Sequence, residues 1–178
     1  MTNRLWIAVP ALLIFLLASC AAHPDLSTRS PLPLAKASEN DVTVNLTLEL
    51  DSAGQVWLAA TFTPENGWHL YSKDLPRDGL NGMGRPTLLE LVPRSQLEVA
   101  GALTESVESG QADGPEGLLI YPAGPVTLRL PVILPEGSGW FDEQISITYM
   151  SCTANLCRPP VIGKLVSVRV PGAAELHP

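Results

Sequence analysis

The chain has 178 residues, of which 46% are hydrophobic and 16% are charged, and it carries a formal net charge of −7 without any basic run. This composition excludes a disordered polymer, and it argues against a nucleic-acid partner because phosphate binding needs clustered Lys and Arg. The length predicts one domain with terminal segments. The 17 prolines and 14 glycines are typical of a chain that turns often between short strands.

Residues 1–19 are predicted to be a secretory signal peptide. Arg4 supplies positive charge, and the apolar run from Leu5 to Leu17 is interrupted only by Pro10. This run is too short for a transmembrane helix, which needs roughly 20 apolar residues to cross a bilayer. No other segment of the sequence is long and apolar enough to span a membrane.

The sequence Leu17-Ala18-Ser19-Cys20 resembles the lipobox of bacterial lipoproteins. This resemblance implies lipidation of Cys20 and cleavage of the chain just before it. An ordinary signal peptide followed by an incidental cysteine is the alternative. Ala21 stands where lipoproteins kept in the inner membrane usually have aspartate, which favours the outer membrane. We therefore expect the protein on the periplasmic side of the bacterial cell envelope, held to the membrane by its lipid anchor only.

The next segment, residues 20–40, is predicted to be a flexible tether because it is rich in proline and small residues and shows no sustained periodicity. The folded domain is expected over residues 41–172. Apolar and polar residues alternate strictly from Val42 to Leu50, which predicts a strand with one buried face. Asp51–Gly54 is a typical turn, and a second strand over Gln55–Phe62 would complete an antiparallel hairpin.

Later segments repeat this pattern, and residues 173–178 are left as a tail. About seven to nine short strands separated by turn residues predict an all-β fold, an immunoglobulin-like antiparallel β-sandwich, with a closed barrel as the alternative. Two stretches, Gly67–Pro86 and Glu105–Gly117, are predicted to be long loops of functional interest. The remaining predicted strands are Leu88–Val92, Leu97–Ala102, Val126–Leu134, Gln144–Met150 and Lys164–Val170.

The cysteines provide the candidate chemistry. If Cys20 carries lipid, Cys152 and Cys157 remain as a pair in an oxidising compartment. Four residues separate them, which is a common length for a hairpin loop. Residues that flank such a loop face each other at a Cα separation of about 5 Å, which permits a disulfide.

The short ring leaves two interpretations open, a redox-active disulfide and an inert staple. In the chain-entropy model so small a ring restrains the unfolded state by only about 2 kcal/mol, and a bond between distant strands would stabilise more. Arg158 follows Cys157 directly, and a cation beside a thiol favours the reactive thiolate. A solvated surface charge is the alternative interpretation of Arg158.

The cysteine segment resembles the redox motif of the N-terminal periplasmic domain of the DsbD thiol–disulfide interchange family. The resemblance covers residues 41–170, and its most specific part is the cysteine motif with its tyrosine and double proline. The matching segments are Ile147–Cys152, Cys157–Pro160, Gly67–Ser72, Gly84–Thr87, Ile120–Tyr121 and Val126–Val132.

This resemblance implies a thiol–disulfide oxidoreductase that relays electrons between thioredoxin-like periplasmic proteins. It assigns the mixed disulfide with partners to Cys157 and the resolving thiol to Cys152. Tyr149 and Tyr71 are implied neighbours of the sulfurs, with ordinary core tyrosines as the alternative. Arg158 completes the expected active-site environment.

Two features depart from the family pattern. Family members shield the disulfide with an aromatic residue in a cap loop, and the corresponding segment Gln111–Gly117 contains none. Either Leu118 or Leu119 takes over the shielding, or the disulfide is more exposed than usual. The family's membrane domain and C-terminal thioredoxin domain have no counterpart in this sequence. We therefore expect a separate membrane electron donor.

Two other functions are compatible with the sequence. One is an immunoglobulin-like lipoprotein that binds a protein partner and whose disulfide is only structural. The other is a copper-handling lipoprotein, because the sequence offers soft ligands in both cysteines, His69, Met83 and Met150. No ligand pair has a recognised metal spacing, so we expect no metal and no cofactor.

Overall fold

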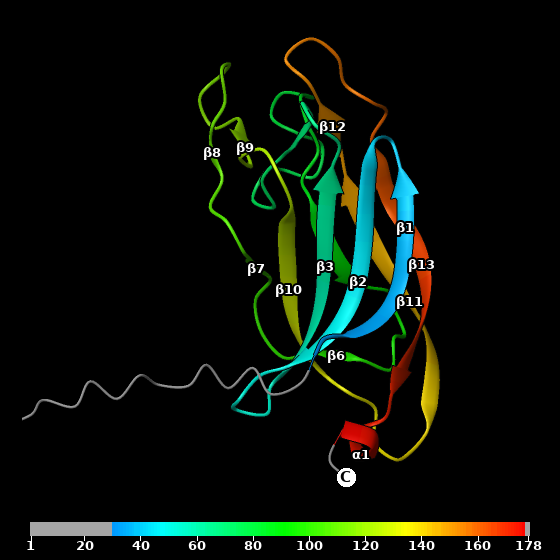
Figure 1. The fold of residues 1–178 in the computed structure, drawn as a ribbon. Coiled ribbons are helices and arrows are strands. Elements are labelled where there is room, and N and C mark those ends of the chain that lie inside the picture. Colours follow the sequence, from blue (N-terminus) through cyan, green and yellow to red (C-terminus); the bar gives the residue numbers. More distant parts are fainter. Residues whose placement is uncertain (1–29, 177–178) are drawn as a thin grey trace, which may run out of the picture.

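The alternating segments form two antiparallel sheets packed face to face, as the computed structural model of residues 30–176 shows (Figure 1). The expected all-β fold, an immunoglobulin-like antiparallel β-sandwich, is confirmed. The larger sheet has the order β1-β2-β3-β10-β6, and β7 also pairs with β10. Its strands are β1 (Leu32–Glu39), β2 (Val42–Leu50), β3 (Val56–Pro64), β6 (Glu98–Val99), β7 (Thr104–Glu105) and β10 (Val126–Ile133).

The second sheet has three strands in the order β13-β11-β5, and two short strand pairs lie outside both sheets. The three strands are β5 (Leu88–Leu91), β11 (Trp140–Tyr149) and β13 (Val161–Pro171). The short pairs are β4 (His69–Leu70) with β12 (Ser151–Cys152), and β8 (Gly110–Gln111) with β9 (Leu119–Ile120).

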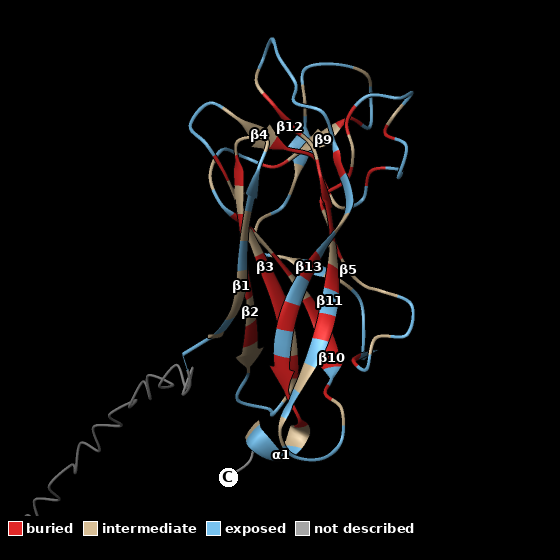
Figure 2. Ribbon diagram, turned by 90° about the vertical axis from the view of Figure 1, so that its right-hand side faces the viewer, coloured by how far each residue is buried: buried red, intermediate tan, exposed pale blue. Residues whose placement is uncertain are grey.

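The core lies between the two sheets and follows the period-two pattern of the sequence. In β2 the alternate residues Val42, Val44, Leu46 and Leu48 are all buried. They pack in one cluster with the inward residues of β3, β10, β11 and β13, so that both facing surfaces are apolar. Figure 2 shows these buried positions along the facing strands.

The predicted tether is wrong over residues 32–39, because these residues form β1. This strand pairs with β2 from Leu32 opposite Leu48 to Glu39 opposite Val42, with a register shift between Pro33 and Ala35. Residues 20–29 of the predicted tether, the signal segment and Cys20 lie outside the described residues. The turn from β1 to β2 consists of Asn40 and Asp41, both with positive φ (50° and 61°), which is the geometry of a two-residue hairpin.

Several further boundaries differ from the predicted ones. The predicted strand over 97–102 is reduced to β6, whereas β11 begins four residues earlier than expected, at Trp140. Within the predicted tail, Ala173–Leu176 form helix α1, and Ala173 and Leu176 pack against the core. None of the described residues belongs to a helix long and apolar enough to cross a membrane.

The two ends of the sandwich differ in what they carry. The short strands β4, β9 and β12 gather at one end, together with the loops that join them, and α1 closes the opposite end (Figures 1 and 2). The cysteine pair therefore lies at the loop-rich end, where the two long predicted loops also converge.

Candidate redox site

The two cysteines face each other at the mouth of a short hairpin. Cys152 ends β12 and forms an antiparallel bridge with Cys157, and the two are joined by a disulfide with a Cα–Cα distance of 4.0 Å. The loop closes on itself through a hydrogen bond from the Thr153 amide to the Leu156 carbonyl, 2.7 Å. The Thr153 hydroxyl oxygen also accepts the Leu156 amide, 3.0 Å. The predicted hairpin thus brings the two sulfurs together.

The two halves of the disulfide differ sharply in exposure. Cys152 is 1% exposed, whereas Cys157 belongs to an exposed run from Ala154 to Pro160. Burial of Cys152 follows from the pairing of β12 with β4, which places Cys152 opposite His69. An incoming thiolate can therefore approach the disulfide from the side of Cys157, and Cys152 is the inner sulfur.

Tyr71 contacts the inner sulfur directly. Its hydroxyl donates to Cys152 Sγ at 3.3 Å, and the whole residue is buried. The ring packs edge-on against His69, with centroids 5.6 Å apart. The Gly84 backbone lies close to the ring, since a Cβ at this position would come within 2.8 Å of the aromatic carbons of Tyr71. The structure thus brings Tyr71 to the disulfide.

A small apolar cluster, separate from the main core, surrounds Cys152. It consists of Tyr71, Leu75, Leu118 and Cys152, with Met150 packed at its edge. Of the two leucines considered for shielding, Leu118 is the one in this cluster. It is 7% exposed and belongs to the same apolar cluster as Cys152.

A groove of about 580 Å³ runs beside the exposed sulfur. The loop over 153–157 forms one wall, and the segment over 112–120 forms the other. Its remaining lining comes from His69 and Tyr71. The groove gives another protein's chain a place to lie against Cys157.

Burial shifts the pKa values of two side chains in this groove, His69 on β4 and Tyr71 just after β4. Burial lowers the pKa of His69, so this imidazole is neutral at physiological pH. Burial also raises the pKa of Tyr71, which keeps its hydroxyl protonated and able to donate.

The Arg158 side chain pairs with residues outside the cysteine hairpin. Its Nε donates to the Asp41 carboxylate, and its guanidinium lies over the Trp68 ring, 5.0 Å from the ring centroid. Asn40 adds a hydrogen bond from its side-chain amide to the Pro159 carbonyl, 2.7 Å. The charge of Arg158 is thus paired, and it anchors the cysteine hairpin to the β1–β2 turn.

The structure places Tyr149 in the main core. The Tyr149 ring packs edge-on against Phe62, 5.7 Å between centroids, and its hydroxyl donates to the Glu39 carbonyl at 3.0 Å. Burial, with a smaller contribution from the nearby Glu39 carboxylate, raises the pKa of Tyr149 to about 12. The structure therefore does not bring it together with the inner-sulfur cluster that contains Tyr71.

Sequence reasoning missed the β1–β2 turn as a support of the site. Asn40 and Asp41 contact the hairpin more than a hundred residues away, and the Ser151 hydroxyl donates to the Asn40 carbonyl at 2.6 Å. An Asn-Asp pair before a strongly alternating strand is a known turn pattern and could have revealed this hairpin. No local sequence pattern indicates that this turn contacts the cysteine hairpin.

Of the soft ligands considered for copper, His69 lies opposite Cys152 in the β4–β12 pair. Across residues 30–176 no three His, Cys, Asp or Glu side chains are grouped so as to hold a metal ion. Met83 is 43% exposed, and Met150 packs against the apolar cluster around Cys152.

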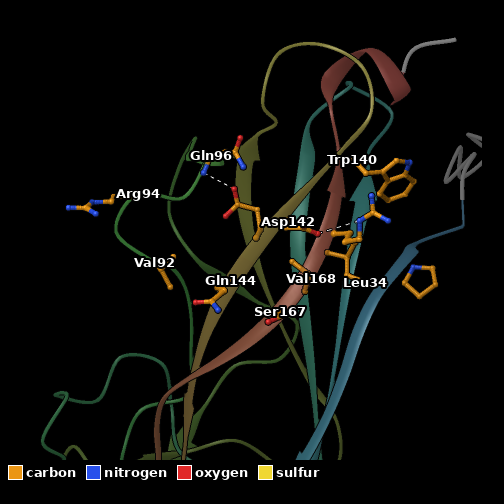
Figure 3. Close-up of a pocket in the computed structure, with 12 residues that line it drawn as sticks. Leu34, Val92, Arg94, Gln96, Trp140, Asp142, Gln144, Ser167 and Val168 are labelled. Atoms are coloured by element: carbon orange, nitrogen blue, oxygen red, sulfur yellow. Dashed lines mark hydrogen bonds and ion pairs between the residues drawn. The ribbon is translucent and has the colours of Figure 1, made fainter.

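A larger surface groove lies elsewhere, toward the α1 end of the sandwich, and has a volume of about 850 Å³. Figure 3 shows its lining residues spread over a broad surface that runs from Arg94 to Leu34. Three of its four charged groups have partners, since Glu143 accepts hydrogen bonds from Ser95 and Gln96, and Asp142 pairs with Arg169. No reactive group lies in it, so the disulfide remains the candidate site.

Solved structures of two N-terminal domains are similar to this chain. One is the reduced N-terminal domain of DsbD from Neisseria meningitidis, at 15% identity and a TM-score of 0.42, over 80% of this chain and 85% of that one. The other is the N-terminal periplasmic domain of ScsB from Proteus mirabilis, at 13% identity and a TM-score of 0.48, over 83% of this chain and 56% of that one. No protein-family model matches the sequence, and no curated protein matches it either. Likeness at this level does not determine function, which must be inferred from the site itself.

Proposed function

We propose that the protein carries out thiol–disulfide exchange through Cys152 and Cys157. The observation that carries this proposal is the asymmetry of the disulfide, with Cys157 exposed beside a groove and Cys152 buried against Tyr71. A disulfide that only stabilises the fold does not need one sulfur accessible to another protein. This one also closes a sequence separation of just 5, for which chain entropy gives about 2 kcal/mol.

The exchange proceeds in two balanced steps. A partner thiolate attacks Cys157 Sγ, a partner–Cys157 disulfide forms, and the Cys152–Cys157 bond breaks with its electron pair leaving on Cys152 Sγ. The partner's second thiolate then attacks its own bridging sulfur and expels Cys157 as a thiolate. The partner is oxidised to a disulfide, and this protein is left as a dithiol. In the opposite direction, the Cys157 thiolate attacks an oxidised partner and Cys152 resolves the mixed disulfide.

We further propose that the partners are thioredoxin-like periplasmic proteins and that a separate membrane protein supplies electrons. The support for this part comes from the resemblance of the cysteine motif to the DsbD N-terminal domain. The lipobox-like sequence that ends at Cys20 supports a lipid-anchored position on the periplasmic side of the envelope.

A trapping experiment tests the exchange. Cys152→Ser removes the resolving thiol and leaves the exposed Cys157, so a mixed disulfide with partners should accumulate on non-reducing electrophoresis of cell extracts. Cys157→Ser is the matched control, because its remaining thiol is buried and should trap far less. Absence of a trapped species with both variants would contradict the proposal and favour a binding protein with a structural disulfide.

A further inference from the structure

The buried sulfur of Cys152 accepts a hydrogen bond from one side chain, although His69 also lies opposite Cys152 in the β4–β12 pair. Within residues 30–176 the hydrogen bond from the Tyr71 hydroxyl, at 3.3 Å, is the one that reaches either sulfur. The nearby cations are engaged elsewhere, since Arg158 pairs with Asp41 and Lys73 with Asp74. A thiolate formed at Cys152 would therefore depend on Tyr71 for stabilisation in an otherwise apolar cluster.

The tyrosine is fixed in this position from several sides. The Thr87 hydroxyl donates to the Tyr71 carbonyl at 2.7 Å, and the Tyr71 backbone bridges to both Pro86 and Ile120. Gly84 permits the close approach of its backbone to the ring face. Because ring and backbone are both held, the hydroxyl is already oriented toward the sulfur before any reaction begins.

We propose that Tyr71 is a catalytic residue that stabilises Cys152 as the leaving thiolate. This inference rests on the proposed exchange function. When a partner thiolate attacks Cys157 Sγ, the disulfide bond breaks and its electron pair moves to Cys152 Sγ. The Tyr71 O–H then donates to a full negative charge instead of a neutral sulfur, and hydrogen bonds to charged acceptors are much stronger than those to neutral ones. Tyr71 thus contributes more after bond cleavage than before it, which is the condition for catalysis.

The same contact should act in the reverse direction. During resolution of a mixed disulfide, Cys152 must be a thiolate in order to attack Cys157 Sγ. Burial alone would hold the Cys152 proton in place, because desolvation disfavours the charged form of a thiol. Donation from Tyr71 offsets part of that penalty and raises the fraction of reactive thiolate.

The test measures the ionisation of Cys152 itself. In the full-length Cys157→Ser protein, with a single thiol in the site, the carbon chemical shift of Cys152 Cβ is followed against pH, with and without Tyr71→Phe. Loss of the hydroxyl should lower the acid dissociation constant of Cys152 about tenfold, the equivalent of a modest charge-assisted hydrogen bond. His69 and Asp113, the other titratable groups that line the groove, are the same in both proteins.

A second measurement follows the reaction. With both cysteines present, Tyr71→Phe should slow reduction of the disulfide by dithiothreitol about threefold, because the leaving sulfur carries only part of its charge in the transition state. Tyr121→Phe is the matched control. This residue is also buried, but its hydroxyl donates to Glu105 at 2.5 Å, so its loss should leave the ionisation of Cys152 unchanged.

The outcomes separate the two proposals. An unchanged Cys152 ionisation in Tyr71→Phe would overturn the role of Tyr71, whether or not Cys157 traps partners. An equal change in Tyr121→Phe would overturn it as well, because the effect would then be a general consequence of losing a buried hydroxyl. A shifted ionisation together with failure of the trapping experiment would uphold the Tyr71–Cys152 contact and refute the exchange function.

Discussion

Reduction of the disulfide should leave the fold intact. A redox-active bond must break and re-form in a folded protein, whereas a structural staple can be essential to folding. The hairpin that holds Cys152 and Cys157 has several supports besides the disulfide. They include two backbone hydrogen bonds. The Thr153 amide donates to the Leu156 carbonyl, and the Arg158 amide donates to the Ser151 carbonyl at 2.9 Å.

The expected cost can be worked from the ring. A sequence separation of 5 corresponds to a loss of about 2 kcal/mol in the chain-entropy model. For a protein of this size that equals a fall in Tm of about 4–8 °C. The change should be fully reversed by reoxidation, since Cys152 is packed among Tyr71, Leu75 and Leu118, and this packing does not require the bond to Cys157.

Urea unfolding of the oxidised and reduced proteins, followed by near-ultraviolet circular dichroism, measures this difference. Cys152→Ala/Cys157→Ala is the control for the reduced state without thiol chemistry. A loss of about 5 kcal/mol or more, or disappearance of the native spectrum on reduction, would refute the reasoning and identify the bond as a structural staple.

Three further predictions concern the surroundings of the inner sulfur. Gly84→Ala should destabilise the fold by about 1–3 kcal/mol more than Gly82→Ala in urea unfolding, because both glycines have positive φ but only at Gly84 would the new Cβ clash with the Tyr71 ring; equal losses would contradict the observed ring packing. Leu118→Ala should cost about 2–3 kcal/mol and speed reduction by dithiothreitol, because Leu118 packs with Cys152; an unchanged reduction rate would show that Leu118 does not shield the bond. The protein should lose stability as the pH falls below about 6.5, and His69→Gln should make this loss smaller. Burial lowers the His69 pKa in the folded state from its ordinary value of 6.5, so the unfolded chain takes up more protons than the folded one as the pH falls. An identical pH dependence of unfolding in this variant and the parent would contradict that environment for His69.

The strands with strict alternation could be predicted from the sequence because their pattern has a local cause. Val42–Leu50 places every second residue in the core, and no tertiary contact is needed to recognise that face. The cysteine hairpin could be anticipated in the same way, from loop length alone. In both cases the relevant contacts are close in sequence.

The missed features depend on contacts that are distant in sequence. Strand β1 contains a proline, Pro33, and its other apolar residues are only part-buried, so its pairing is decided by the neighbouring β2 and not by its own pattern. Arg158 pairs with Asp41, which lies 117 positions earlier in the chain. Tyr71 contacts Cys152 over a sequence separation of 81 residues. Such pairs arise from how β4, β12 and the β1–β2 turn meet at one end of the sandwich.

The equilibrium reduction potential of the Cys152–Cys157 bond tests the central claim most directly. Titration of the full-length protein in buffers of defined thiol–disulfide ratio, with the two states separated after alkylation, gives this value. A reversible transition with a potential above about −300 mV is the predicted result, as for a bond open to exchange. A potential well below that value, or reduction only after denaturation, would contradict the claim that this disulfide exchanges electrons with other proteins.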